Sequence, residues 1–374
     1  MAQIPKLRVV AEASVPYLRG VLEQYAEPRY LDNPDITQAS IQDCDALFVR
    51  SITKCNAQLL EGTSVRYIVT ATAGSDHIDT DYCQQRGIAW DSTPGCNAIA
   101  VAQYVFSSLS LLSLRHGLQL WDKTIGIIGV GHVGRQVERI AQALGMRVLR
   151  YDPPRAALEG NEGFVSLSDI QREADIISLH VPLTAETRHM VNADFLNQCQ
   201  RQPILINACR GPVTDTDALI VAMQNQQINR LVLDCWEGEP KPNTTLMALA
   251  DIASPHIAGF SADGKHRGAR MALLAYCKHF GIEAPVTLLE PKELEGPNEL
   301  INLSTYPENE AIARAFLATF SPEGIDQQLR RGIESFEYLR KHYPYPREMA
   351  AHRVCCPYIG PSEVLRKIGF TLIV

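Results

Sequence analysis

Short apolar runs alternate along this chain with longer segments whose apolar residues recur at helical spacing. Runs of four to eight apolar residues are typical of buried strands, and an apolar residue every three or four positions indicates an amphipathic helix. Strands are predicted at residues 7–11, 46–49, 67–70, 125–130, 147–151, 175–179, 203–207, 230–235 and 252–254, and helices at 15–25, 98–114, 133–144, 194–200, 215–226 and 264–281. This alternation predicts parallel sheets covered by helices on both faces.

The character of the chain changes near residue 283. Pro285, Pro291 and Pro297 interleave with acidic residues there, which is typical of a linker. Beyond it the pattern predicts helices at 308–320, 324–342 and 362–368 and short strands at 354–356 and 371–374. The tail carries no catalytic motif and is expected to be a separate α+β domain.

A glycine turn follows the strand at 125–130 and opens the helix at 133–144. It reads Gly129-Val130-Gly131-His132-Val133-Gly134. In a strand–turn–helix unit of this kind, the first glycine permits a tight turn, the second lets a pyrophosphate approach the backbone, and the third lets helix and strand pack closely. The helix N-terminus then offers unpaired N–H groups to the phosphates. The segment therefore predicts a dinucleotide-binding, Rossmann-type domain.

Asp152 closes the next strand, 23 residues after Gly129. An acid at about this distance binds the adenosine ribose hydroxyls and repels a 2′-phosphate. The sequence thus predicts NAD, not NADP, as the cofactor.

Composition narrows the class of protein. A net charge of −7 argues against a general nucleic-acid binder. The cysteines show no spacing typical of zinc sites, so we expect reduced thiols and no metal. The first residues lack the apolar core of a signal peptide, and the apolar segment 98–114 carries Gln103 and several serines, which favours a buried helix over a membrane span. We expect a cytoplasmic protein without a membrane partner.

Three polar residues follow successive predicted strands of the dinucleotide-binding segment: Arg210, Glu239 and His256. The carboxyl ends of parallel strands meet at one edge of a sheet, so these side chains can converge. Oxidation of an alcohol with NAD needs a base for the hydroxyl proton, for which histidine has a suitable pKa. A carboxylate can orient the imidazole, and the arginine fork suits a substrate carboxylate. Each residue alone is also compatible with an ordinary turn or surface position.

Two loops in the first part of the chain are candidates for substrate binding, because they also follow predicted strands. One is Arg50-Ser51-Ile52-Thr53-Lys54, and the other runs from residue 71 to 79. Arg50 and Lys54 suit a phosphorylated substrate, although both are equally compatible with solvated surface charges.

Six motifs occur in an order that identifies a family: ATAGSDHID, GVGHVG, HVPLT, INACRGPVTD, DCWEGEP and SPHIAGF. From about residue 7 to 281 the chain resembles the D-2-hydroxyacid dehydrogenases, which implies NAD-dependent oxidation of a 2-hydroxy acid. VRSITK, YDPPRA and the tail sequences ESFEYLRKHY and VLRKIGF resemble a branch that acts on a phosphorylated 2-hydroxy acid and forms a homodimer through its C-terminal domain. The implied architecture is a Rossmann NAD-binding domain (99–260) inserted in a flavodoxin-like substrate domain (1–98 and 261–286), followed by a dimerisation domain (287–374).

The resemblance also implies roles for single residues. It makes Arg210 and Glu239 active-site residues and His256 the proton donor or acceptor. It places Ser51 and Thr72 on the substrate, and we expect the backbone of Ala73 and Gly74 to help hold its carboxylate. NAD-contacting positions, besides the glycine turn, are Asp152, Val181, Ala208, Cys209, Arg210, Asp234 and Gly259.

Phe260 departs from the family pattern, which has a substrate-binding tyrosine after the glycine. A phenylalanine lacks the hydroxyl, so one substrate hydrogen bond is lost or replaced. Two alternatives stay open: another D-2-hydroxyacid dehydrogenase such as phosphoglycerate dehydrogenase, and a non-enzymatic NADH-sensing protein of the same fold. A further hypothesis is that Arg347 or Arg353 in the tail reaches the site of a partner subunit.

Overall fold

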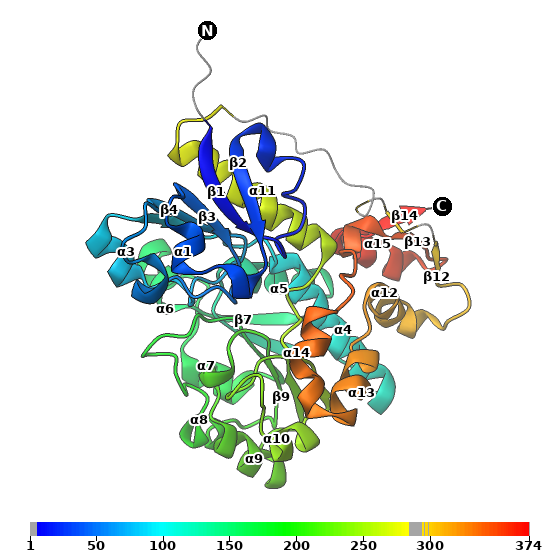
Figure 1. Cartoon of the computed structure of the whole chain (residues 1–374). Helices are drawn as coiled ribbons and strands as arrows, with labels where there is room; N and C mark the ends of the chain where they lie inside the picture. Colours follow the sequence, from blue (N-terminus) through cyan, green and yellow to red (C-terminus); the bar gives the residue numbers. More distant parts are fainter. Residues whose placement is uncertain (1–5, 284–293, 295, 298, 374) are drawn as a thin grey trace. The chain divides into compact units, whose positions relative to one another are not determined.

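A computed structural model describes residues 6–283, 294, 296–297 and 299–373 of the 374-residue chain (Figure 1). It divides into two compact units: residues 1–97 with 262–295, and residues 98–261 with 296–374. The linker predicted at Pro285 and Pro291 lies outside the described residues. The division of the second unit into an NAD-binding domain (99–260) and a C-terminal domain (287–374) stays a prediction.

The first unit is built on a five-stranded parallel sheet in the order β2-β1-β3-β4-β5. This is the flavodoxin-like order of a doubly wound sheet, as predicted. Its strands are β1 (Leu7–Glu12), β2 (Ala26–Leu31), β3 (Ala46–Val49), β4 (Tyr67–Thr70) and β5 (Ala89–Asp91). The accompanying helices are α1 (Gln38–Ile41), α2 (Ala57–Leu60), α3 (Thr80–Arg86) and α11 (Ala262–His279).

Both faces of this sheet are buried. Val9, Phe48 and Tyr67 pack with Ala272 and Tyr276 of α11, and the opposite-facing side chains of the same strands form a second core with residues of α1–α3. Because β3 and β4 are buried on both faces, their sequences ALFV and YIVT are almost entirely apolar.

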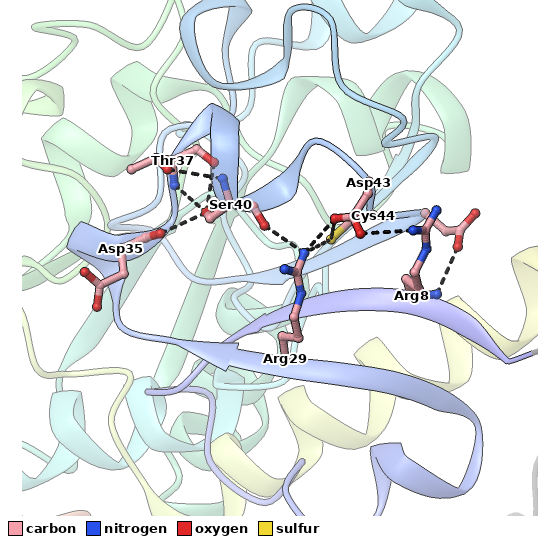
Figure 2. A network of polar contacts seen from close by, with 8 residues as sticks. Arg8, Arg29, Asp35, Thr37, Ser40, Asp43 and Cys44 are labelled. Atoms are coloured by element: carbon pink, nitrogen blue, oxygen red, sulfur yellow. Dashed lines mark hydrogen bonds and ion pairs between the residues drawn. The ribbon is translucent and has the colours of Figure 1, made fainter.

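Polar contacts tie the edge strand β2 to the rest of this unit (Figure 2). Arg29 of β2 donates to Asp43 at 2.9 Å, to the carbonyl oxygen of Ser40 at 2.8 Å and to the Cys44 thiol at 3.1 Å. Arg8 of β1 donates to the other oxygen of Asp43 at 2.9 Å. One acid thus joins the two strands to the segment that enters β3.

The helix predicted at residues 15–25 is wrong. The structure has turns there, followed by a short 3-10 helix, η1 (Leu22–Gln24). Tyr17 and Gly20 have φ of 63° and 89°, in the left-handed region that interrupts a right-handed helix. Val15 and Leu18 are nevertheless buried. The apolar spacing therefore predicted which side chains are buried, but it did not predict the backbone conformation.

The second unit is built on a six-stranded parallel sheet in the order β11-β10-β9-β8-β6-β7. Its strands are β6 (Thr124–Ile128), β7 (Arg147–Tyr151), β8 (Ile176–Leu179), β9 (Ile204–Asn207), β10 (Arg230–Leu233) and β11 (Ile252–Ala253). The helices along this part of the chain are α4 (Ala98–His116), α5 (His132–Ala143), α6 (Pro153–Glu159), α7 (Leu167–Glu173), α8 (Ala193–Asn197), α9 (Thr216–Gln224) and α10 (Thr244–Leu249).

The strand order reverses at β6. The chain runs from β6 to β7 on one side and then crosses back to β8 on the other side. Ligands of doubly wound sheets bind at such a switch point, at the carboxyl ends of the strands. The glycine turn follows β6 directly, so it lies at this point.

The C-terminal segment packs within the second unit. It contains β12 (Ile301–Asn302), α12 (Ala311–Thr319), α13 (Glu323–Arg331), α14 (Phe336–Lys341), β13 (Arg353–Cys355), α15 (Ile359–Ile368) and β14 (Thr371–Ile373), and the three strands form a parallel sheet in the order β12-β13-β14. Helix α12 packs against α4 (Figure 1), where Phe316 stacks on Phe106 with ring centroids 5.8 Å apart. The single helix predicted at 324–342 is wrong, because α13 ends at Arg331 and Gly332 after it has extended backbone before α14 begins.

Helix α4 is the one helix among the described residues that is long and apolar enough to cross a membrane, and 78% of its apolar window is buried inside the protein. Its inward-facing Gln103 donates to Thr319 Oγ1 at 3.0 Å and to the Arg347 carbonyl oxygen at 3.1 Å. A core helix of a folded unit has these properties.

Candidate active site

The glycine turn has the close contacts that its sequence predicted. Gly129 has φ of 88°, and a Cβ there would lie 2.6 Å from the carbonyl oxygen of His180 and 2.9 Å from Val181 Cγ1. A Cβ on Gly134 would lie 2.1 Å from the carbonyl oxygen of Gly129. Only glycine fits at either position, and Val181 lies beside the turn, as its predicted role requires.

Gly131 differs from its neighbours, because a Cβ there would meet nothing within 4 Å. It is the N-cap of α5, makes no side-chain capping bond, and His132 and Val133 form the first turn. The first N–H groups of this helix therefore lack a side-chain acceptor and carry its partial positive charge. The open space at Gly131, together with uncapped N–H groups at the start of α5, fits a pyrophosphate.

Asp152 lies against the same turn. Its Oδ2 accepts from the Val130 N–H at 2.7 Å, and its Oδ1 caps α6 by accepting from Arg155 N at 3.0 Å. Arg155 in turn donates to the Val130 carbonyl oxygen at 2.7 Å. The carboxylate is thus held at the end of β7, where the remaining acceptor capacity suits ribose hydroxyls. The residues at this switch point fit NAD.

His256 and Glu239 lie together, as predicted. His256 Nδ1 and Glu239 Oε2 are 2.8 Å apart, and the two side chains are 26% and 21% exposed. The other oxygen of Glu239 accepts from the Trp236 backbone N–H at 2.7 Å. Burial raises the pKa of Glu239, but the hydrogen bond and positive charge of His256 outweigh this, so its pKa lies below the usual value. An ionised carboxylate therefore orients the imidazole and leaves Nε2 for other chemistry.

A buried aspartate holds the backbone around His256. Asp234 is fully buried, and its carboxylate accepts from Ser254 Oγ at 2.6 Å and from the N–H groups of Ile257 and Ala258 at 2.8 and 2.9 Å. The His256 N–H donates to the Asp234 carbonyl oxygen at 2.8 Å. His256 has φ of 56°, a left-handed conformation that a residue with a side chain adopts only when its surroundings impose it. The hydrogen bonds of Asp234 with His256, Ile257 and Ala258 hold His256 in this conformation.

Arg210 lies on the loop after β9, next to the loop that carries Glu239. A Cβ on Gly211 would lie 2.0 Å from the backbone of Trp236, so glycine permits the close approach of the two loops. Arg210 donates to the Cys209 carbonyl oxygen at 2.7 Å, and Asn207 Nδ2 donates to the Arg210 carbonyl oxygen at 3.0 Å. Ala208, Cys209 and Gly259 lie on the same loops after β9 and β11.

A second imidazole–carboxylate pair braces these loops, and the sequence reasoning missed it. His189 Nε2 and Glu237 Oε1 are 2.6 Å apart, and the other oxygen of Glu237 accepts from the N–H and hydroxyl of Thr216 at 3.1 and 2.8 Å. Glu237 precedes Glu239 by two residues, so this pair fixes the loop that carries the active-site acid. The signal was Glu237 itself, the first acid of the sequence Glu237-Gly238-Glu239.

The predicted substrate loops belong to the first unit and follow adjacent strands of its sheet. Arg50 and Ser51 follow β3, and a buried acid, Glu12 at the end of β1, holds their loop. One Glu12 oxygen accepts from the Arg50 N–H at 3.0 Å and from Thr53 Oγ1 at 2.7 Å. Ser51 and Lys54 are exposed. Glu12 was missed, although an acid directly after the first predicted strand was a signal of the same kind as the others.

The second loop is ordered by a chain of hydroxyls. His77 Nε2 and Thr70 Oγ1 are 3.0 Å apart, Thr70 Oγ1 and Thr72 Oγ1 are 2.7 Å apart, and Thr72 donates to the Gly74 carbonyl oxygen at 3.0 Å. The hydroxyl chain thus fixes the loop that contains Ala73.

Phe260 packs against the C-terminal segment of the second unit. Its ring centroid lies 6.3 Å from that of Tyr343 and 5.8 Å from that of Tyr345. Tyr343 and Tyr345 therefore lie beside Phe260, which lacks the hydroxyl of the tyrosine in the family pattern.

Comparison with known proteins identifies the family. The family described as D-isomer specific 2-hydroxyacid dehydrogenase, NAD binding domain, matches residues 109–258. Among solved structures, D-lactate dehydrogenase from Aquifex aeolicus complexed with NAD and lactic acid is 27% identical with a TM-score of 0.63, over 73% of this chain and 96% of that chain. The NAD+-bound 3-phosphoglycerate dehydrogenase of Entamoeba histolytica is 26% identical with a TM-score of 0.64, over 74% of this chain and 96% of that chain.

Relatives that match over nearly the full length bear a more specific name. The erythronate-4-phosphate dehydrogenase of Porphyromonas gingivalis is 49% identical over 371 residues, which are 97% of this chain and 100% of the relative. That of Edwardsiella ictaluri is 41% identical over 372 residues, which are 97% of this chain and 99% of the relative. The resemblance to a dehydrogenase of phosphorylated 2-hydroxy acids is thereby confirmed. The chain belongs to the D-isomer specific 2-hydroxyacid dehydrogenases and, within them, to the erythronate-4-phosphate dehydrogenases.

Proposed function

We propose that this protein is an NAD-dependent dehydrogenase that oxidises 4-phospho-D-erythronate to (R)-3-hydroxy-2-oxo-4-phosphooxybutanoate, a step in the biosynthesis of pyridoxal 5′-phosphate. The observation that carries the reaction type is the His256–Glu239 contact of 2.8 Å, in the same unit as the dinucleotide turn. The choice of substrate rests on the relatives that match over nearly the full chain.

His256 and Glu239 have different roles in the transfer of the substrate proton. NAD, when bound, supplies the hydride acceptor. His256 takes the proton of the C2 hydroxyl at Nε2, because Nδ1 faces Glu239. Glu239, ionised and held by the Trp236 N–H, stabilises the imidazolium that results. Arg210 is assigned to the C1 carboxylate of the substrate.

We also assign the other predicted site residues to this function. Arg50 and Lys54 are assigned to the phosphate, Ser51 and Thr72 to substrate oxygens, and the backbone of Ala73 and Gly74 to the carboxylate. Phe260 is assigned to an apolar contact with the substrate. NAD is assigned to Gly129, Gly131, His132, Val133, Gly134, Asp152, Val181, Ala208, Cys209, Arg210, Asp234 and Gly259.

The test is NADH formation from three substrates: 4-phosphoerythronate, 3-phosphoglycerate and an unphosphorylated 2-hydroxy acid. We expect the highest kcat/KM with 4-phosphoerythronate. A preference for 3-phosphoglycerate would instead assign the protein to the phosphoglycerate dehydrogenases. NADH binding without turnover of any substrate would favour an NADH-sensing protein.

A variant separates catalysis from binding. His256→Ala should abolish turnover and leave NADH binding, followed by nucleotide fluorescence, nearly unchanged. Turnover by His256→Ala within tenfold of the wild-type rate would show that another base takes the proton.

The proposal includes a cytoplasmic homodimer that dimerises through residues 287–374, with no nucleic-acid or membrane partner. Light scattering after size-exclusion chromatography measures the oligomeric state directly. A monomer at micromolar concentration would contradict it.

A further inference from the structure

A cysteine lies beside the imidazole–carboxylate pair and has no part in the proposed reaction. Ligand atoms of Cys235, Glu239 and His256 all lie within 4.8 Å of one another. Cys235 follows β10 by two residues and is 1% exposed, whereas the side chains of Glu239 and His256 are about a quarter exposed. The imidazole and the carboxylate are therefore both partly in contact with solvent, whereas the thiol is not.

We propose that Cys235, Glu239 and His256 form an inhibitory binding site for Zn²⁺. Thiolate, carboxylate and imidazole are the three side-chain ligands that zinc prefers, and three protein ligands leave a fourth position for water. In a tetrahedral site, donors at these bond lengths lie roughly 3.3–3.6 Å apart. Small side-chain rotations adjust the observed spacing to that value, and the hydrogen bond between His256 and Glu239 opens to admit the ion.

The charges in the cluster also suit a divalent cation. One thiolate and one carboxylate balance the two charges of Zn²⁺, so that the site is neutral inside the protein. Burial raises the pKa of the Cys235 thiol well above its ordinary value, partly opposed by the charge of Arg210. The thiol is therefore protonated before the metal arrives, and binding of the metal releases one proton.

Occupancy would block the proposed base. A metal on Nδ1 uses the only lone pair of the neutral imidazole, and the ring proton then resides on Nε2. Nε2 cannot accept the substrate proton in that state. This inhibitory effect rests on the proposed function, whereas the metal site itself rests only on the geometry of the three residues.

Cobalt provides a test of binding that needs no turnover. The full-length protein is treated with chelator, freed of chelator and titrated with Co²⁺, whose bond to a thiolate produces a near-ultraviolet charge-transfer absorption. We expect a band that saturates at one equivalent, disappears on addition of Zn²⁺, and is lost in Cys235→Ala and Cys235→Val. Cys277→Ala is the matched control, because Cys277 is also a buried thiol, 2% exposed, outside the cluster.

Inhibition is measured on the same variants. We expect Zn²⁺ to inhibit NADH formation reversibly, with removal by chelator, and we expect Cys235→Val to raise the half-inhibitory Zn²⁺ concentration at least tenfold. Cys277→Ala should leave it unchanged. Absence of the cobalt band, or an equal band in Cys235→Val, would overturn the site. A cobalt band with equal Zn²⁺ sensitivity in all variants would overturn the inhibitory role, and a protein that shows the band but oxidises no substrate would overturn the proposed function alone.

Discussion

The orientation of the catalytic imidazole depends on two oxygens of one side chain. Glu239 Oε2 contacts His256 and Glu239 Oε1 is fixed by a backbone N–H. A neutral amide in place of the carboxylate would accept from the Trp236 N–H with its oxygen and turn its NH₂ toward His256 Nδ1. The ring proton would then lie on Nε2, so the imidazole could not take the substrate proton, and the charge that stabilises an imidazolium would also be lost.

Replacement of that charge has a defined expected effect. We expect Glu239→Gln to lower kcat by about 10²–10⁴-fold, the usual contribution of acid–base catalysis. The affinity for NADH should change little, because Glu239 contacts none of the glycine turn. Steady-state kinetics and a binding titration measure the two quantities. A loss of NADH affinity as large as the loss of kcat would show that the residue acts mainly on the cofactor.

His180 makes stability depend on pH. Burial lowers its pKa to about 3, and its Nε2 lies 2.8 Å from Ser178 Oγ. A histidine that is neutral in the folded state and titrates near 6.5 when unfolded contributes its full stability above pH 6.5. It loses this contribution as the pH falls toward 3. Between pH 7 and pH 5 the loss is about 2 kcal/mol.

A substitution isolates this contribution. His180→Gln keeps a hydrogen-bonding group near Ser178 but does not titrate. Its free energy of unfolding should fall by about 2 kcal/mol less than that of the wild type between pH 7 and pH 5. Denaturant titrations at the two pH values measure the difference. Equal pH dependence in both proteins would mean that His180 does not bind a proton on unfolding in this range.

Most residues proposed for the site could be predicted because each follows a predicted strand of a parallel sheet. The same rule missed Glu12 and Glu237, which hold loops in place and take no part in the chemistry of the proposed reaction. Cys235 was missed for another reason: spacing along the chain indicates a zinc site only when the ligands are close in sequence, whereas the fold brings His256 to Cys235 and Glu239. Contacts of this kind arise only in the folded chain and leave no pattern in the sequence.

Helices and strands with a clear pattern of apolar residues were predicted well. Elements whose conformation depends on contacts with other parts of the chain were not. The buried strands β6, β8 and β9 are mostly apolar runs (TIGII, IISL and ILIN) and were predicted. The edge strand β2, with sequence AEPRYL, was missed because its polar residues are stabilised by contacts such as those of Arg29. Apolar spacing alone predicted helix at 15–25, where positive φ values prevent it.

Close approach of two loops gives a prediction at the scale of elements. A Cβ at Gly211 would overlap the Trp236 backbone. We expect Gly211→Ala to lower the free energy of unfolding by about 1–3 kcal/mol and to lower kcat, because it separates the loops of Arg210 and Glu239. Denaturant titration and steady-state kinetics measure both effects.

Gly324→Ala is the matched control for this substitution. Gly324 lies in the first turn of helix α13, where a Cβ would meet nothing within 4 Å, and alanine there should not lower the free energy of unfolding. If Gly211→Ala were as stable and as active as Gly324→Ala, the proposed contact between the loops would be wrong.

The second unit, taken as a whole, relies on the C-terminal segment to close one edge of its sheet. Strand β11 is the edge, and Asp326 of α13 accepts from the Ala253 N–H at 2.7 Å in a buried setting. Arg330 pairs with Asp326 and donates to the Met247 and Ala250 carbonyl oxygens at the end of α10. The helix thereby satisfies backbone groups that the sheet leaves unpaired.

Removal of this closure should destabilise the whole unit. We expect Asp326→Ala to lower the free energy of unfolding by about 1–3 kcal/mol, because a buried N–H loses its acceptor. Asp122→Ala, at a side chain that is 71% exposed, should change it by less than about 0.5 kcal/mol. Denaturant titrations compare the two, and equal stability would show that water replaces Asp326 at the edge.

The interleaved order of the two units constrains how the protein is made. Residues 98–261 leave the ribosome well before residues 296–374, yet both belong to one compact unit. Until the last segment has been synthesised, the nascent chain exposes the N–H of Ala253 and the apolar face of α4 that α12 later covers. At about 5–20 residues per second, that exposure lasts for several seconds in every round of translation. Premature termination before α12 would leave the unit that carries the glycine turn without both contacts, and we expect chaperones to bind the exposed face of α4.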